Sequence, residues 1–407
     1  MTLAILATAV LALLVAGELG CRWWVRRSRY LVWPPGGRVE IRVDREVCPE
    51  LEPLVRFDSN ADGERGGDVR RGEDGLWRIL VVGGSAVECF MLDQYTSWPG
   101  ALERLLNTAD SLRTLGARRV HVGNIGHSGV GSAELDLMLE RVLPQYGHLD
   151  AILVMVGASD IYHWLEEGAP PARAPAQVPE QMLFACHPQH PFGWTPGRWA
   201  VAEVARRLRR SWLHPLEVKE RGGAWFAAAR RMRAEAKELR TTVPDPAVVL
   251  DHFEHHFRRV LYRATAHADR VLVVRQPWFE KDYTPEEEAH FWHGGVGMPW
   301  NETVSVYYSL EIVNHLLGLV EARVSRVAEA VGLPHVGLRS VLSQGLRHYY
   351  DHDHYTPAGA AVVARTVAAA LLGRSQRQPR RDAASDDASL SFSETRVLCT
   401  SSLPPTR

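Results

Sequence analysis

Short apolar runs alternate with longer amphipathic stretches along the middle of this chain. Each of the clearest runs is rich in β-branched residues and stops at or close to a glycine or proline, as expected of a buried strand that leads into a loop. Four such runs cover residues 79–82, 120–124, 151–156 and 271–274, and a weaker fifth covers 335–338. Helical patterns separate them. The alternation predicts a parallel sheet with helices on both faces, and ligands in such sheets bind beyond the carboxyl ends of the strands.

The first 29 residues have a different pattern. Residues 3–17 form an uninterrupted apolar run, which Glu18 ends and which Trp23, Trp24 and several arginines follow. An apolar core with tryptophans and arginines at its flank predicts an N-terminal membrane anchor over 1–29, with a cleaved signal peptide as the alternative. Because the arginines follow the apolar run, the positive-inside rule would leave the main domain in the cytoplasm, but we leave the side of the membrane open.

Three further segments lie outside the alternation of strands and helices: residues 30–75, the insertion at about 162–246, and residues 374–407. Residues 30–75 are rich in Pro, Gly, Arg and Asp and predict a juxtamembrane linker and entry loop, whereas 374–407 have the composition of a disordered tail. Residues 76–373 then form the main domain, with an insertion at about 162–246. The insertion has a Pro-rich stretch and basic amphipathic patterns over 199–210 and 224–240. We expect a helical cap, and contact with anionic lipid headgroups is the alternative.

Composition narrows the classes of partner. The chain has 407 residues, 46% of them hydrophobic, which suits an enzyme-sized globular core. Its formal net charge of −1 gives no electrostatic reason to expect a nucleic-acid partner. The five cysteines are scattered and lack metal-ligand spacing, so neither a disulfide framework nor a zinc site is indicated.

Ser85 is the first residue that suggests chemistry. It follows Gly83-Gly84 at the end of the first predicted strand, where a serine hydroxyl would lie at the edge of the sheet near a helix N-terminus. A helix cap in a Gly-Gly-Ser turn would give the same pattern. Val87 stands where the G-x-S-x-G elbow of α/β-hydrolases has its second glycine, so that fold is not indicated.

A second cluster lies far downstream, where Asp351, His352, Asp353 and His354 precede a predicted helix that starts with Thr356 as N-cap. An imidazole that acts as a base needs one nitrogen held by a carboxylate and the other free, and the spacing of Asp351 and His354 allows this within one turn. A metal site is the competing interpretation of this acid and imidazole cluster, but no further ligand group is evident.

Together these blocks resemble the SGNH (GDSL-like) hydrolases, over roughly residues 57–372. The matching segments, in chain order, are Gly83-Gly84-Ser85, residues 124–129, Gly157-Ala158-Ser159-Asp160, and residues 351–354 with Gly359. Residues 57–63 are similar to the N-x-x-G stretch of membrane-anchored members, and Arg275-Gln276-Pro277 also fits. The resemblance implies a flavodoxin-like three-layer α/β/α sandwich with a mostly parallel five-stranded sheet and no cofactor.

The resemblance also implies roles for individual residues. Ser85 is the expected nucleophile, with Asp351 and His354 completing a triad, and the oxyanion hole would use the N–H groups of Ser85 and Gly126. The family's third donor is an asparagine side chain, but this chain has Ser159 there, which puts that donor in doubt. Further candidates for substrate contact are Gly84, Asn124 and Asp160.

The function that we expect is hydrolysis of an acyl ester, on a glycan or on a lipid or other small molecule, through an acyl-enzyme intermediate. An acyltransferase that modifies envelope glycans and a catalytically silent binding protein are the alternatives, the second because of Ser159. Five tryptophans could stack against sugars, although tryptophans at strand ends more often pack in the core. They are Trp98, Trp164, Trp278, Trp292 and Trp300.

Overall fold

The computed structural model describes residues 2–70, 72–172, 180–188, 199–213 and 216–373. Its centre is a sheet of five strands in the order β10-β8-β5-β3-β4, and every neighbouring pair is parallel. The strands are β3 (Leu76–Gly83), β4 (Arg119–Asn124), β5 (Leu149–Met155), β8 (Ala268–Val274) and β10 (His335–Val336). All five predicted strands are present, and the order is the flavodoxin-like one.

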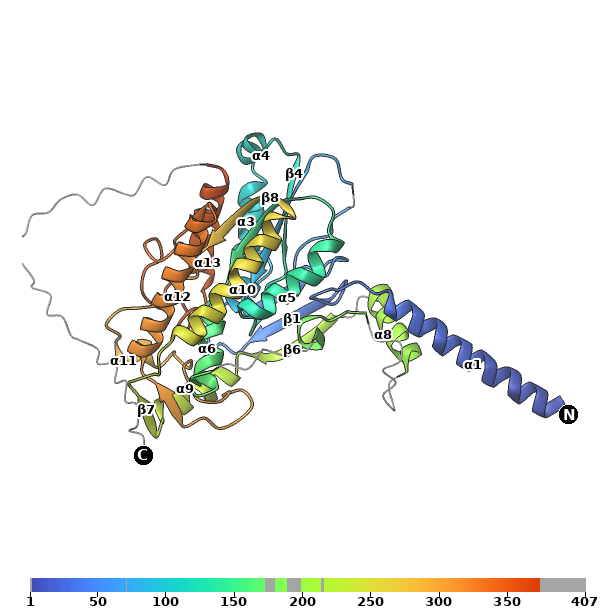
Figure 1. Ribbon diagram of the computed structural model, residues 1–407, viewed down its shortest axis with the longest axis horizontal. Coiled ribbons are helices and arrows are strands. Elements are labelled where there is room, and N and C mark those ends of the chain that lie inside the picture. Colours follow the sequence, from blue (N-terminus) through green and yellow to red (C-terminus); the bar gives the residue numbers. More distant parts are fainter. Residues whose placement is uncertain (1, 71, 173–179, 189–198, 214–215, 374–407) are drawn as a thin grey trace, which may run out of the picture.

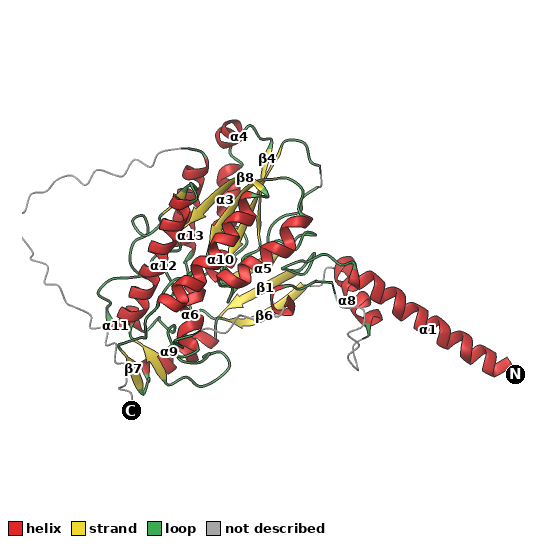
Figure 2. Cartoon of the chain, in the orientation of Figure 1, coloured by secondary structure: helices red, strands yellow, loops and turns green. Residues whose placement is uncertain are grey.

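The sheet is buried on both faces because successive side chains of its strands enter two separate apolar clusters. In β3, Leu80 and Val82 belong to one cluster and Ile79 and Val81 to the other. Side chains from α5 (Ser132–Val142), α6 (Ala158–Glu166), α10 (Ala247–Thr265) and α12 (Leu310–Ala330) complete the first cluster. Those from α3 (Trp98–Leu106), α9 (Trp225–Ala234) and α13 (Pro357–Leu371) contribute to the second. The result is the three-layer α/β/α sandwich seen in Figure 2.

Residues 30–75 differ from the linker that their composition predicts. They contain β1 (Arg38–Val43) and β2 (Leu54–Asp58), which pair antiparallel, while β6 (Leu216–Gly222) from the insertion pairs parallel with β1. Ile41 and Val55 are fully buried in the second cluster. The strands alternate charged and apolar residues, which is the period-two pattern of half-buried strands, and the prediction of a linker from composition overlooked it.

The insertion is also only partly helical. The helix α8 (Ala200–Leu213) lies close to the predicted 199–210, but the helix predicted over 224–240 ends at Ala234. The segment continues as β7 (Glu238–Arg240), which pairs with β9 (Val306–Tyr308), so pairing with a distant strand outweighs local helical preference here. Most of the Pro-rich stretch lies outside the described residues, as does the predicted tail over 374–407.

Short elements complete the chain, and one long helix projects from it. The short helices are α2 (Ser85–Glu88), α4 (Ala109–Leu115), the 3₁₀ turn η1 (Leu143–Gln145), α7 (Glu180–Leu183) and α11 (Pro285–Glu288). The helix α1 (Thr2–Arg26) extends away from the sandwich, as Figure 1 shows. Its residues Ala4–Arg26 are long and apolar enough to cross a membrane, a property that membrane anchors and signal sequences share.

Candidate active site

Ser85 is placed by the end of β3 and by two glycines. It is the first residue of α2, directly after Gly83 and Gly84. A Cβ on Gly83 would lie 1.9 Å from the carbonyl oxygen of Met155 in the adjacent strand β5, so only glycine fits there. This close approach lets the chain turn sharply and leaves Ser85 at the carboxyl edge of the sheet.

The residues of the predicted triad meet at this edge. His354 Nε2 lies 2.7 Å from Ser85 Oγ, and His354 Nδ1 lies 2.8 Å from Asp351 Oδ2. Tyr350 stacks on the imidazole, with ring centroids 5.6 Å apart and planes 14° from parallel. Serine, imidazole and carboxylate therefore form one hydrogen-bonded chain, although 269 residues separate Ser85 from His354.

Asp351 is held as a carboxylate by several donors. Besides His354, the backbone N–H groups of Asp353 and His354 donate to its Oδ1, and the indole Nε1 of Trp292 donates to its Oδ2 at 3.0 Å. Burial of the Asp351 carboxyl opposes its ionisation, but the charge and hydrogen bonds of His354 outweigh burial and hold its pKa well below the usual range. For His354, burial disfavours the charged ring, yet the carboxylates of Asp351 and Asp353 prevail and raise its pKa to about 9.

A second acid and imidazole pair lies behind the triad. Asp353 accepts from Gln276 Nε2 at 3.1 Å and lies 3.4 Å from His293 Nε2. Burial raises the pKa of Asp353 to about 7. Four side chains lie close enough together to hold a metal ion: His293, Asp351, Asp353 and His354. However, Asp351 is hydrogen-bonded to His354 Nδ1, and His354 Nε2 is hydrogen-bonded to Ser85. These hydrogen bonds suit an imidazole of His354 that is held in place to act as a base. His352 has a different position, in which its ring is hydrogen-bonded to Tyr162 and Asn314.

The N–H of Gly126 is not available to an oxyanion in this conformation, contrary to the expected role. It donates to Asn124 Oδ1 at 2.7 Å, while Asn124 Nδ2 donates to the carbonyl of Val87. Asn124 thus ties the end of β4 to the nucleophile helix instead of facing a substrate. Three residues on, Gly129 is exposed with φ of +74°, and its N–H has no acceptor within the described chain. The sequence prediction chose Gly126 and did not consider Gly129, the second glycine of the same block.

Ser159 and Asp160 begin α6 beside the nucleophile loop. A Cβ on Gly84 would lie 3.2 Å from Ser159 Oγ, so this hydroxyl borders the backbone next to Ser85. Asp160 is buried and accepts from the backbone N–H and the hydroxyl of Ser132 at 2.9 and 2.6 Å. The carboxyl of Asp160 therefore fixes the start of α5 and does not face a substrate.

Arg65 holds the loop that follows Ser85, and sequence reasoning did not single it out. Its buried guanidinium donates to the carbonyls of Glu88, Cys89 and Leu92, just beyond α2. Burial lowers the pKa of Arg65 to about 10. It lies two residues after Gly63, in the stretch whose Asn60 side chain accepts from the N–H groups of Asp62 and Glu64. The N-x-x-G pattern therefore marks a turn that brings an arginine to the back of the nucleophile.

A small cavity opens beside Ser85 and His354. Ala86, Cys89, Leu92, Tyr350 and Tyr355 form the rest of its wall. Cys89 has φ of +52° and ψ of 44°, a left-handed conformation that costs a non-glycine residue on the order of 1 kcal/mol. The Cys89 side chain forms part of the cavity wall, and a glycine at this position would leave that space open.

The predicted tryptophans have different roles. Trp98, Trp164 and Trp278 are buried, and the indoles of Trp98 and Trp164 donate to the carbonyls of Ala86 and Pro170, so these rings pack in the core. Trp292 supports Asp351. Trp300 is half exposed and forms an aromatic group with Trp225 and Trp292, with ring centroids 5.0 to 6.4 Å apart.

Comparison with known proteins identifies similar folds. No family model and no curated protein sequence matches the chain. Among solved structures, it is similar to the acetylxylan esterase Axe2 of Geobacillus stearothermophilus, with 13% identity, a TM-score of 0.37 and coverage of 73% of this chain and 94% of that one. A lipolytic protein of the G-D-S-L family from Veillonella parvula has 9% identity, a TM-score of 0.37 and coverage of 72% and 96%.

The four sequence blocks lie next to the ends of the sheet's strands or the start of α13. Gly83-Gly84-Ser85 follows β3, residues 124–129 follow β4, Gly157 to Asp160 follow β5, and Asp351 to His354 precede α13. All four therefore meet at the carboxyl edge of one parallel five-stranded sheet. The fold is a flavodoxin-like three-layer α/β/α sandwich, and it brings the four sequence blocks to one edge of its sheet.

Proposed function

We propose that this protein is a serine ester hydrolase that acts through Ser85, His354 and Asp351. The observation that carries the proposal is the hydrogen-bonded chain from Ser85 Oγ through both nitrogens of His354 to Asp351. Such an arrangement activates a hydroxyl that is otherwise a weak nucleophile. It favours a catalyst over a silent binding protein, even though Ser159 replaces the expected asparagine.

In the proposed reaction, His354 Nε2 takes the proton of Ser85 Oγ as the oxygen attacks the ester carbonyl. The tetrahedral intermediate collapses, the alcohol leaves with the proton from His354, and the acyl group stays on Ser85. Water, deprotonated by His354, then releases the acid and restores the hydroxyl. The N–H groups of Ser85 and Gly129 are the proposed donors to the oxyanion, with the Ser159 hydroxyl as a third.

We further propose a short acyl group on a glycan as the substrate. The cavity beside Ser85 is small and is walled by side chains that include Leu92, Tyr350 and Tyr355, which supports a short acyl chain. The exposed rings of Trp225 and Trp300 reach the triad through Trp292 and offer apolar faces on which a sugar can stack. The Axe2 neighbour is named as an acetylxylan esterase, which makes acetylated xylooligosaccharides a reasonable first substrate.

The test is a comparison of the full-length protein with Ser85→Ala on p-nitrophenyl acetate and on acetylated xylooligosaccharides. We expect acetate release from both substrates, reduced by at least about 10³-fold in the variant. Equal turnover by wild type and Ser85→Ala would refute the mechanism. Hydrolysis of p-nitrophenyl acetate alone would keep the mechanism and reject this glycan, and transfer of acetyl to an added sugar in place of release would identify an acyltransferase.

A further inference from the structure

The helix α8 is attached to the end of α1 by specific contacts. The Glu18 carboxylate in α1 accepts from the backbone N–H groups of Ala200 and Val201, at 3.0 and 3.1 Å. These are the first N–H groups of α8, which otherwise have no partner within the helix. Near the other end of the contact, Arg207 donates to Ser28 Oγ at 2.6 Å and its guanidinium lies 5.9 Å from the ring of Trp24. The two helices therefore form one unit.

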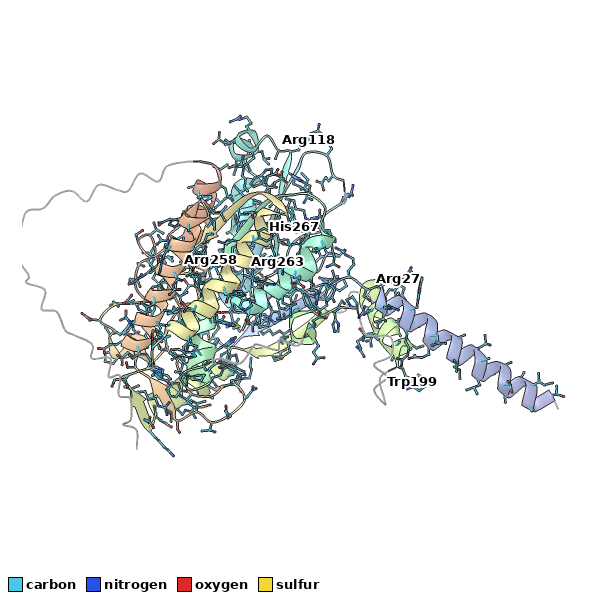
Figure 3. The ribbon with its side chains drawn as sticks, in the orientation of Figure 1. Arg27, Arg118, Trp199, Arg258, Arg263 and His267 are labelled. Atoms are coloured by element: carbon cyan, nitrogen blue, oxygen red, sulfur yellow. The ribbon has the colours of Figure 1, made fainter. Side chains whose placement is uncertain are left out.

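This unit lies where the apolar part of α1 ends. Glu18 is the first charged residue after the apolar run, so α8 starts at the level at which α1 would leave the hydrocarbon of a bilayer. Three tryptophans are exposed at this level: Trp23, Trp24 and Trp199, the last with 61% of its surface accessible. Figure 3 shows Arg27 at the base of the projecting helix and Trp199 at the outer end of α8. Tryptophan is the residue that prefers the membrane–water interface.

The face of α8 that points away from α1 has no partner among the described residues. Val201 and Leu208 are exposed on it, one helical period of seven apart, with Leu208 41% accessible. Arg209 and Arg206, which pairs with Glu203 in the preceding turn, are exposed beside them. Apolar side chains flanked by arginines are the composition of a helix that lies in the headgroup layer of an anionic membrane.

We propose that α8 and residues 18–27 of α1 form a collar that binds the headgroup layer of a membrane containing anionic phospholipids. Val201 lies at the apolar boundary of the leaflet, and Leu208, next to the Arg207 that contacts Ser28, lies in the headgroup layer, where Arg206 and Arg209 bind lipid phosphates. The proposal rests on α1 as a membrane anchor and is independent of the esterase activity. Because Arg29 pairs with Asp62 and the Tyr30 N–H donates to Gln145, the collar is joined firmly to the catalytic domain and fixes its orientation on the membrane.

The test uses the full chain in vesicles, with an environment-sensitive fluorophore at Leu208→Cys. Cys21 and Cys399 are changed to Ser, since the other cysteines are buried. A matched protein carries the label at Leu239→Cys, which is 58% exposed in β7 at the far end of the domain. We expect the label at 208 to be several-fold less accessible to aqueous iodide when phosphatidylcholine vesicles include phosphatidylglycerol, and the label at 239 to be unaffected.

Charge variants identify the cause. Arg206→Glu/Arg209→Glu is expected to restore iodide access at 208 in the anionic vesicles, whereas Arg118→Glu/Arg258→Glu, on the domain surface labelled in Figure 3, leaves the protection intact. Equal iodide access at 208 and 239 in anionic vesicles would overturn the collar. Failure of the protein to float with any vesicles would overturn the collar as well, because α1 would then not be an anchor. Acetate release measured in the same sample would show that the esterase proposal is unaffected by that result.

Discussion

The indole of Trp292 donates to Asp351 Oδ2, the same oxygen that accepts from His354 Nδ1. Because this donor stabilises the carboxylate that orients the base, Trp292→Phe should lower kcat/KM by about tenfold, the value of one hydrogen bond to a charged group. Trp300→Phe changes a neighbouring ring with half its surface exposed and should leave activity on p-nitrophenyl acetate unchanged. Steady-state kinetics of both variants checks this, and full activity of Trp292→Phe would show that Asp351 does not need the indole.

The pH dependence follows from the raised pKa of His354. The ring must be neutral to accept the serine proton, and its pKa is about 9, so kcat/KM should rise with pH and level off above about pH 9. The Asp353 carboxylate helps to raise this pKa, so Asp353→Asn should move the rising limb to lower pH. Asp74→Asn, an exposed carboxyl, serves as the control. A limb that stays in place in Asp353→Asn would mean that Asp353 does not act on the base.

Cys89 is expected to limit the length of the acyl chain. Its side chain borders the cavity next to Ser85, so both Cys89→Gly and Cys89→Ala should raise the ratio of kcat/KM for p-nitrophenyl butyrate over acetate several-fold. Only the glycine variant also removes the cost of a left-handed backbone at a non-glycine residue, which is on the order of 1 kcal/mol. The Tm of Cys89→Gly should therefore be higher than that of Cys89→Ala. An unchanged chain-length profile in both variants would place the acyl group elsewhere.

Ser159 leaves room for a gain of function. An asparagine amide reaches further than a hydroxyl, and one added oxyanion donor is worth up to about 10² to 10³ in turnover. We therefore expect Ser159→Asn to raise kcat by about tenfold or more with little change in KM. Ser159→Ala should lower kcat if the hydroxyl already donates. Should Ser159→Asn be no faster than wild type, the third donor must come from another group.

The strands of the central sheet and the position of Ser85 at its edge were predictable because they depend on local patterns. β-branched runs that end at or near a glycine or proline mark β3, β4, β5 and β8, and the blocks that follow them lie at one edge by the rules of parallel sheets. The alternation of charged and apolar residues in β1 and β2 is visible in the sequence but was outweighed by the Pro, Gly, Arg and Asp content of 30–75, whereas β7 is set by pairing with β9, which no local window reveals. The N–H of Gly126 donates to Asn124 Oδ1 and so is not free for an oxyanion. This single hydrogen bond within a loop could not be predicted from the sequence.

The supporting residues were harder to predict for the same reason. Arg65 and Trp292 act through contacts with residues 23 and 59 positions away. Neither stands in a pattern that indicates such a role, although Arg65 follows the N-x-x-G turn that the sequence does show. Long-range contacts of this kind become visible only when the sheet brings the loops together.

Labelling of the full-length protein with a fluorophosphonate, followed by mass spectrometry, tests the central claim most directly, since it needs no knowledge of the substrate. An activated serine should give a single adduct on Ser85, which is absent in Ser85→Ala and strongly reduced in His354→Ala. No adduct on folded wild-type protein, or equal labelling of Ser85 in His354→Ala, would contradict the proposed triad.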